Sequence, residues 1–225
     1  MVHSHDDKHE REYLAELMQL FPVYPQLSLD EADEQIKDFW NNLASAEEFA
    51  EELKELSNQA VYAFFQKIPK ELHKQLFGGI LNNAGEYRKT TDPNNGEVFF
   101  GPSTNQFAGA DPAMIDSMLR KNISSLKLSP PDPVDVAAKF YQRFVNIHPF
   151  NDGNGRIGRF IVAVYLIYHQ YRIDFEQLRE TTRWLKQLNY CHRKSDVPLS
   201  YPHSLKWWVH HFRKFVVHEN ELNKF

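Results

Sequence analysis

The sequence predicts an all-α protein, a bundle of about eight helices with one small β-hairpin. Apolar residues recur at helical spacing along most of the chain, and capping residues or Asp-Pro pairs stand where these periodic segments begin. Strands and helices do not alternate along the chain, so a parallel α/β sheet is not expected. The 225 residues are enough for one large domain with its own core.

The N-terminal part of the chain contains two capping boxes, Ser28-x-x-Glu31 and Ser45-x-x-Glu48. The apolar face after the first box consists of Ile36, Phe39, Trp40 and Leu43. The apolar face after the second box consists of Phe49, Leu53, Leu56, Ala60 and Phe64. We therefore expect a helical extension over residues 1–44, followed by a core domain over residues 45–200.

Two further helices are predicted where an aspartate precedes a proline, because the aspartate can cap the helix and proline suits its first position. The helix after Asp111-Pro112 would bury Ile115, Met118, Leu119 and Ile123. The helix after Asp132-Pro133 would bury Ala137, Phe140, Tyr141, Phe144 and Val145. The same spacing places His148 on the inward face at the end of this helix, and Pro149 then forces a turn.

The last third of the chain is also predicted to be helical. Residues 160–168 are apolar on every side, as in a helix at the centre of a domain, and are too few to cross a bilayer. Residues 201–225 are predicted as a C-terminal helix. Its apolar face would consist of Leu205, Trp208, Val209, Phe212 and Val216.

One segment interrupts the helical pattern. Residues 87–91 and 97–100 are extended in character and flank the sequence Asp92-Pro-Asn-Asn-Gly96. Asn-Gly between two such runs favours a tight β-turn, so we expect a hairpin near residues 87–101.

Residues 148–159 carry the strongest functional signal, with the sequence His-Pro-Phe-Asn-Asp-Gly-Asn-Gly-Arg-Ile-Gly-Arg. A histidine such as His148 can accept a proton near neutral pH, and a carboxylate such as Asp152 can hold a hard divalent cation. Glycines let backbone N–H groups approach an anion at a helix N-terminus. Arg156 and Arg159 are three residues apart and would share one face, where they can bind phosphate oxygens.

The same segment matches a second pattern, because Gly153, Gly155 and Gly158 satisfy G-x-G-x-x-G, with Asp174 at a suitable distance for a ribose-binding acid. A dinucleotide-binding fingerprint must follow a β-strand. The segment before it has helical spacing, so we do not favour this interpretation. A Walker-type loop is excluded because no Gly-Lys-Ser/Thr ends the segment.

Residues 148–159 resemble the signature of the Fic family, H-P-F-x-D/E-G-N-G-R-x-x-R, and match it at every fixed position. The resemblance extends to the segments Leu72-His-Lys-Gln-Leu-Phe77 and Ala84-Gly-Glu-Tyr-Arg88, and covers roughly residues 45–190. It implies a Fic-type helical bundle with a β-hairpin flap over the active site. The related Doc branch, which phosphorylates its target, carries alanine and lysine inside the signature, and this chain does not.

The resemblance implies a protein adenylyltransferase that transfers AMP from ATP to a Ser, Thr or Tyr hydroxyl of a target protein. His148 would be the general base, and Asp152 would hold Mg²⁺ or Mn²⁺. The phosphates would be bound by Gly153, Asn154, Gly155, Arg156 and Arg159. Phe150 resembles the residue whose packing fixes this loop, and the flap would pair with the backbone of the target.

Regulation is a further expectation from the resemblance. Many Fic proteins carry an inhibitory helix with the pattern S/T-x-x-x-E-G/N, whose glutamate pairs with the second arginine of the signature. Glu219-Asn220 fits the end of this pattern, although Phe215 stands where the pattern has Ser or Thr. Glu219 would continue the apolar face of the C-terminal helix. Two interpretations stay open: Glu219 pairs with Arg159 and inhibits the enzyme, or it is an ordinary glutamate at a frayed helix end.

Composition limits the remaining function classes. The net charge of −4 and pI near 6.3 argue against a nucleic-acid surface. The single cysteine, Cys191, and the lack of a visible membrane span or signal peptide favour the cytoplasm. A homo-oligomer is compatible with the sequence. Two alternatives stay open: a Fic enzyme that uses another nucleotide or a phosphocholine donor, or that removes AMP from protein, and a non-enzymatic nucleotide-binding module.

Overall fold

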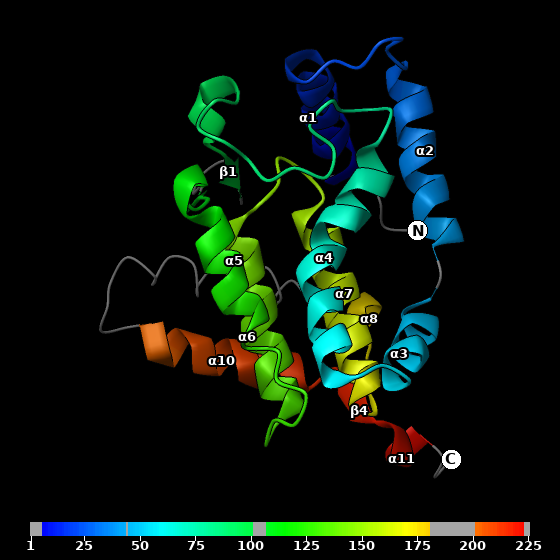
Figure 1. Ribbon diagram of the computed structural model, residues 1–225, viewed down its shortest axis with the longest axis vertical. Helices are drawn as coiled ribbons and strands as arrows, with labels where there is room; N and C mark the ends of the chain where they lie inside the picture. The colour runs from blue at the N-terminus through cyan, green and yellow to red at the C-terminus, as the bar shows by residue number, and fades with distance from the viewer. Residues whose placement is uncertain (1–5, 44, 101–106, 181–200, 223–225) are drawn as a thin grey trace.

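The computed structural model describes residues 6–43, 45–100, 107–180 and 201–222, and it confirms the predicted helical bundle (Figure 1). The N-terminal helices are α1 (Asp6–Leu20), α2 (Leu29–Asn42), α3 (Ala46–Lys54) and α4 (Asn58–Phe77). The central helices are α5 (Ile115–Ile123), α6 (Pro133–Ile147) and α7 (Asn154–Tyr168). The last helices are α8 (Phe175–Glu180), α10 (Tyr201–Arg213) and α11 (Glu219–Leu222). Cys191 lies outside the described residues.

The predicted capping boxes both form. Ser28 and Ser45 each accept a hydrogen bond from the backbone N–H three residues on, and the carboxylate of the glutamate there accepts one from the N–H of the serine. The helix predicted to run from Phe49 to Phe64 is instead two helices, because α3 ends at Lys54. The Ser57 hydroxyl accepts a hydrogen bond from the N–H of Ala60, so this serine caps α4 and the chain turns before it.

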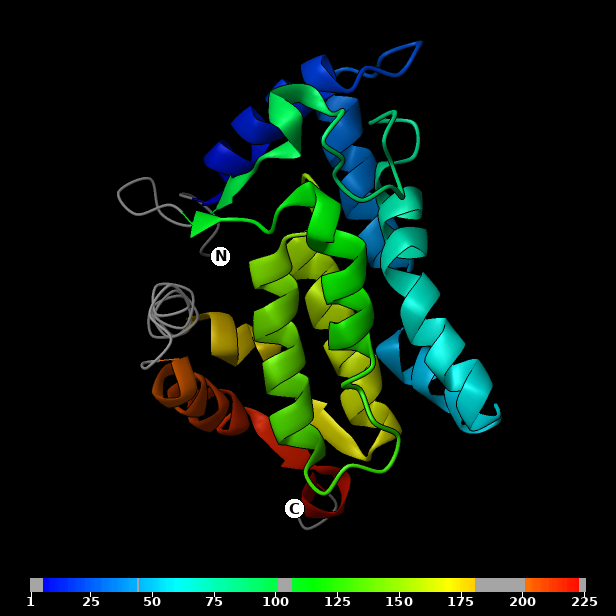
Figure 2. The same ribbon diagram turned by 60° about the vertical axis from the view of Figure 1, so that its left-hand side comes forward.

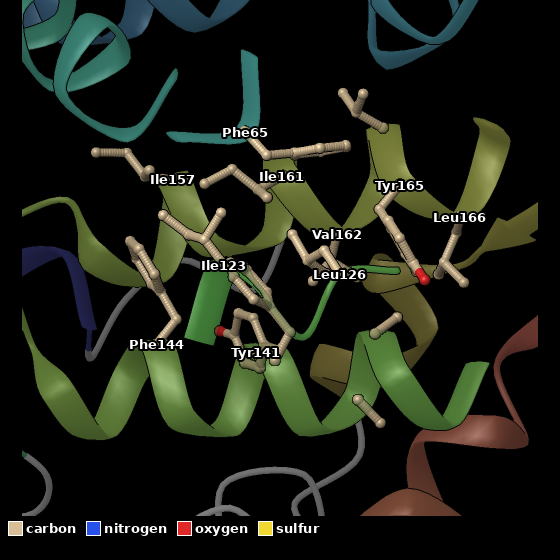
Figure 3. Close-up of a cluster of buried hydrophobic side chains, with 14 of the residues drawn as sticks. Phe65, Ile123, Leu126, Tyr141, Phe144, Ile157, Ile161, Val162, Tyr165 and Leu166 are labelled. Atoms are coloured by element: carbon tan, nitrogen blue, oxygen red, sulfur yellow. The ribbon is translucent and has the colours of Figure 1, made fainter. Parts of the chain in front are cut away.

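Helix α7 lies at the centre of the main core, with α3, α4 and α6 packed against it. Figure 3 shows the side chains of α6 and α7 interdigitating, with residues of α4 and α5 closing the sides. The apolar residues predicted for α6 are buried as expected. This packing holds the ends of α6 and α7 in fixed positions, and the segment 148–153 connects those ends.

A second apolar cluster joins α1 and α2 to the end of α4. Its buried residues include Leu14, Leu17, Phe21, Ile36 and Leu76. Tyr13 of α1 also contacts the 148–153 segment, because its hydroxyl donates a hydrogen bond to the Asn151 carbonyl at 2.9 Å. Burial, together with the nearby Asp152 carboxylate, raises the pKa of Tyr13 to about 12.

The predicted hairpin exists, but its strands lie further along the chain than expected. Strand β1 (Phe99–Phe100) pairs antiparallel with β2 (Phe107–Ala108), and residues 87–91 form no strand. The Asn-Gly sequence lies in a short 3₁₀ turn, η1 (Pro93–Gly96), where Asn94 and Asn95 have φ values of 54° and 55°. The Asp92 carboxylate accepts from the N–H of Lys89 at 2.8 Å, so the turn closes on itself before strand pairing begins.

The prediction of one C-terminal helix reaching Val216 and Glu219 is wrong. Helix α10 ends at Arg213, and strand β4 (Val216–His218) then pairs antiparallel with β3 (Tyr171–Ile173). Adjacent β-branched valines suit a strand that has a partner, and this tertiary pairing overrides the helical spacing. Figure 2 shows α11, in red, at the end of the molecule opposite α1, in blue. None of the described helices is both long and apolar enough to span a membrane.

Candidate functional site

Residues 148–153 form an elbow, or loop, between α6 and α7, and this elbow brings the predicted site residues together. Asp132 caps α6, and the 3₁₀ turn η2 (Pro112–Met114) precedes α5 on the neighbouring segment. His148 ends α6 in the left-handed region, with φ 50° and ψ 62°, and its N–H still donates to the Phe144 carbonyl at 3.1 Å. This conformation turns the chain out of the helix at the residue predicted to be the base.

The imidazole of His148 is half-buried, and its Nδ1 lies 3.3 Å from the Val145 carbonyl oxygen. A carbonyl can only accept, so this contact favours the tautomer with the proton on Nδ1. The lone pair is then on Nε2, the nitrogen that would accept a substrate proton.

Asn154 closes the loop from inside. Its Oδ1 accepts from the Phe150 N–H at 3.0 Å, and its Nδ2 donates to the Phe150 carbonyl at 2.8 Å. The Asn154 side chain is therefore committed to the loop, and only its backbone N–H can face an anion. Phe150 itself is fully buried and stacks on His73, with ring centroids 4.1 Å apart.

The start of α7 provides the backbone cradle. Gly153 precedes the helix with φ 75°, and a Cβ there would lie 3.0 Å from the Phe77 ring. Side chains are disfavoured at such φ, so glycine is required at this turn. The N–H groups of Asn154, Gly155 and Arg156 have no acceptor within their own helix, and the helix dipole adds positive potential there. An anion fits this position.

The charged residues of the segment surround this cradle. Asp152 accepts from the Gly153 N–H at 2.5 Å and pairs with Arg156, whose Nη2 lies 3.3 Å from Oδ2. The Arg159 guanidinium lies beside Gly155, since a Cβ built on that glycine would be 3.4 Å from Nη1. Within the described part of the chain, no carboxylate forms an ion pair with Arg159.

The side chains at the elbow fit a magnesium ion that is held partly by the protein and partly by the phosphates of a bound nucleotide. No group of three or more metal-ligating side chains occurs among the described residues, and the elbow offers the single carboxylate of Asp152. Mg²⁺ often takes only one or two protein carboxylates and fills its other positions with phosphate oxygens and water. Asp152 is about a quarter exposed beside the cradle, so it is accessible to such an ion.

Two buried side chains near the elbow were not predicted from the sequence. His73 of α4 is 1% exposed, its Nδ1 accepts from the Gly85 N–H at 2.8 Å, and its ring supports Phe150. Burial, with a contribution from the Arg156 charge, lowers the pKa of His73 to about 3, so the ring is neutral. Arg88 is 2% exposed and contacts the backbone of His148. Both residues lie in the segments 72–77 and 84–88, which resemble the Fic family, but the sequence alone assigned no role to either side chain.

The prediction for Glu219 is overturned. Its Oε1 lies 3.3 Å from Nε of Arg172, and its N–H donates to the Gln170 carbonyl at 2.9 Å. Gln170 follows the C-terminal end of α7, whereas Arg159 lies in the second turn of that helix. At 1.5 Å per residue the separation along α7 is about 16 Å. Glu219 and the loop thus lie at opposite ends of α7.

These observations define a class of protein: a helical domain in which two central helices meet at an elbow whose geometry fits an anion. Residues 66–166 match the Fic/DOC family. The match covers 101 of the 225 residues and includes the elbow, which is the segment that resembles the Fic signature.

Proteins that carry the Fic name are similar to this chain at low sequence identity. The chain is 31% identical over 123 residues to Protein adenylyltransferase Fic of Drosophila grimshawi, covering 53% of this chain and 24% of that protein. The Drosophila erecta protein of the same name is 31% identical over 98 residues, covering 43% of this chain and 18% of that protein. The chain thus matches only about a fifth of the length of these curated relatives.

Solved structures show the same fold. The N-terminal Fic domain of a Bep effector protein from Bartonella sp. AR 15-3 superimposes with a TM-score of 0.56 at 16% identity, covering 93% of this chain and 95% of that one. A Fic domain of a VirB-translocated Bep effector from Bartonella quintana, solved with bound ADP, gives a TM-score of 0.54 at 16% identity, with 87% and 89% covered.

Proposed function

We propose that this chain is a protein adenylyltransferase, which transfers AMP from ATP to a Ser, Thr or Tyr hydroxyl of a target protein. One observation carries the proposal: a histidine, a carboxylate, a glycine cradle and two arginines converge on one elbow. The name of the Drosophila relatives and the ADP in the Bartonella quintana domain support it.

In the proposed reaction, Nε2 of His148 accepts the proton of the target hydroxyl. The hydroxyl oxygen attacks the α-phosphorus of ATP, an O–P bond forms, and the bond from the α-phosphorus to the bridging oxygen breaks, releasing pyrophosphate. The backbone N–H groups at the start of α7 bind the phosphates whose charge increases during transfer. Arg156 and Arg159 hold the remaining phosphate oxygens through forked hydrogen bonds.

Mg²⁺ or Mn²⁺ is part of the proposal and would be held by Asp152 together with the nucleotide. When bound, the ion neutralises phosphate charge and supports departure of the pyrophosphate. The Asp152–Arg156 pair at 3.3 Å is long, so the carboxylate can exchange this contact for the cation. Arg156 is then available to the phosphates.

The β1–β2 hairpin is the proposed docking surface for the target, which revises the flap expected near residues 87–101. The outer edges of a two-stranded sheet carry main-chain N–H and C=O groups that can pair with an added strand. Such pairing gives affinity through main-chain hydrogen bonds, with little side-chain specificity. Phe99 is 59% exposed, so an apolar side chain is available beside these groups.

The experiment that tests the proposal is auto-modification with ATP and Mg²⁺ or Mn²⁺, measured by intact mass. Wild type should gain the mass of AMP, and His148→Ala should slow this gain by a factor of about 10² to 10⁴. His210→Ala is the matched control, because that histidine is exposed on α10. Equal rates for wild type and His148→Ala would contradict the role of His148.

The alternatives give different results in the same experiment. A different added mass with GTP, UTP or a phosphocholine-bearing diphosphate would indicate another donor. Loss of AMP from a previously modified protein would indicate the reverse reaction. Measurable ATP binding without any added mass would favour the nucleotide-binding module.

A further inference from the structure

Arg88 is a buried cation with an unusual set of partners. Its Nε donates to the His148 carbonyl at 2.7 Å, and its Nη2 donates to the carbonyls of Ala110 at 2.9 Å and Ile147 at 3.3 Å. Its Nη1 donates to the carbonyl of Gly96. The side chain thus gathers backbone oxygens from three segments that are far apart in sequence.

None of the described carboxylates forms an ion pair with this guanidinium. Burial lowers the pKa of Arg88 to about 10, so the group is still charged near neutral pH. A buried charge without an anion is costly, and here only peptide dipoles offset it. Two of the accepting carbonyls, those of Ile147 and His148, lie at the C-terminal end of α6, where the helix dipole is negative.

Arg88 joins the β1–β2 hairpin to the end of α6. The proposed reaction requires these two parts to be held in a fixed relative position. Gly96 precedes β1, Ala110 follows β2, and His148 carries the proposed base. The backbone supports the same junction, because the Arg88 N–H donates to the Pro149 carbonyl at 2.9 Å and the Ala110 N–H donates to the Ile147 carbonyl at 3.0 Å. Arg88 therefore contacts both ends of the hairpin and the end of α6.

Gly109 shows how closely these parts approach. A Cβ built on Gly109 would lie 2.8 Å from Nη2 of Arg88, 2.9 Å from a methyl group of Val98 and 3.2 Å from Cβ of His148. Any side chain there would push the strand away from the guanidinium and from the histidine. The hairpin backbone therefore passes directly against the residue that would accept the proton.

We propose that Arg88 is a positioning residue that fixes the β1–β2 hairpin relative to His148, so that a hydroxyl on a strand paired with the hairpin reaches Nε2. This inference rests on the proposed function, because it assigns the hairpin to the target and His148 to the proton. A misplacement of about 1 Å can cost on the order of 10²-fold in rate. The planar fork of arginine can serve several carbonyls at once, which the single ammonium of lysine cannot do.

The proposal predicts a specific kinetic pattern. The proposed phosphate cradle lies on α7, and the Arg88 side chain donates its hydrogen bonds to carbonyls outside that helix, so the affinity for ATP should persist in Arg88→Met and Arg88→Lys. The kcat for protein modification should fall by about 100-fold in Arg88→Met and by about 10-fold in Arg88→Lys. Arg120→Met is the matched control, because Arg120 is an exposed arginine paired with Asp116 on α5.

The experiment measures kcat, the ATP dissociation constant, the melting temperature and amide hydrogen exchange of residues 96–100 and 107–110. Lower kcat with retained ATP binding and faster exchange in the hairpin would support the proposal. Wild-type kcat in Arg88→Met would overturn it, and so would a parallel loss of kcat, ATP affinity and melting temperature, since that pattern indicates general destabilisation.

Gly109→Ala keeps the proposal testable if the Arg88 variants do not fold. The added methyl group should displace the guanidinium, lower kcat by about 10-fold and leave ATP binding unchanged. Wild-type kcat in this variant would overturn the proposal. If wild type itself transfers nothing from ATP, the proposed function fails. Amide hydrogen exchange of the hairpin and the NMR signal of the His148 ring then test the positioning role of Arg88 without any measurement of activity. Unchanged exchange and an unchanged ring signal would then refute the positioning role.

Discussion

The two ends of the α6–α7 pair have different interiors. Away from the loop, the helices are separated by apolar side chains such as Tyr141, Ile161 and Val162, as Figure 3 shows. Around the loop, the interior contains His73, Arg88, Asn151 and Asn154, which are four of the seven buried polar or charged residues in the described part of the chain. The molecule therefore concentrates its buried polarity where the signature segment lies.

The difference separates two tasks. Apolar packing stabilises the pair of helices without requiring one particular loop geometry, because many volume-conserving cores are tolerated. Buried polar groups require hydrogen-bond partners in fixed directions, so they specify the loop conformation. Loss of any partner leaves a buried polar group unpaired, which lowers the free energy of unfolding. Substitutions at the two ends should thus affect stability and the function of the proposed site in different proportions.

The largest effect on stability is expected at the apolar end. Phe140 is fully buried, and Phe140→Ala should lower the free energy of unfolding by about 3–5 kcal/mol, measured by urea denaturation. The affinity for ATP should be unchanged wherever the variant remains folded. Met118→Ala, on the exposed side of α5, serves as the control and should cost less than about 1 kcal/mol. A loss of ATP affinity in folded Phe140→Ala would show that the two ends are not separate.

A smaller stability loss with a larger functional loss is expected for Asn154→Ala. The substitution removes both hydrogen bonds to the Phe150 backbone and should lower the free energy of unfolding by about 1–3 kcal/mol. Because the loop carries the proposed phosphate cradle, calorimetry should show at least about tenfold weaker ATP binding.

Asn122→Ala is the matched control for this prediction. Asn122 is also buried and donates to the Phe140 carbonyl at 3.1 Å, away from the loop. A similar stability loss with unchanged ATP affinity is expected. Equal loss of ATP affinity in both variants would contradict the comparison between the two ends.

His73 gives a pH-dependent test of the polar end. Its pKa of about 3 lies below the ordinary 6.5, so the unfolded chain binds the proton first as the pH falls. The stabilisation is fully present above pH 6.5 and is progressively lost toward pH 3. His73→Phe and His73→Gln should each flatten the dependence of the free energy of unfolding on pH by up to about 1.4 kcal/mol per pH unit. Denaturation at several pH values measures this slope, and an unchanged slope would refute the prediction.

The smallest effect is expected from Glu219→Gly. The Arg172–Glu219 pair is well exposed, with side chains 43% and 32% accessible, so its loss should change the free energy of unfolding by less than about 1 kcal/mol. ATP binding and auto-modification should match wild type, because Glu219 lies at the end opposite the loop. Faster auto-modification in this variant would show that the C-terminal segment reaches Arg159.

The sequence predicted what depends on local periodicity and capping. The bundle, the caps at Ser28, Ser45 and Asp132, and the meeting of His148 with the start of α7 all follow from spacing within one or two helices. The strand β4 was missed because its partner, β3, lies more than 40 residues earlier in the chain, and helical spacing alone gave no sign of that pairing.

Arg88 was missed for a related reason. Its partners are backbone carbonyls at positions 96, 110, 147 and 148, and any residue type can supply a carbonyl. The hairpin was displaced by about ten residues because Asn-Gly also suits a turn that closes locally. Such outcomes depend on tertiary contacts, which residue types and spacings do not encode individually.

The backbone of His148 has a consequence for engineering. Helices usually place glycine where this residue adopts φ 50°, and a non-glycine residue in that region costs on the order of 1 kcal/mol. Replacement by glycine would relieve this cost and remove the imidazole at the same time. A library of variants selected only for thermal resistance would therefore enrich chains without the proposed proton acceptor, so a functional screen must accompany any attempt to stabilise this protein.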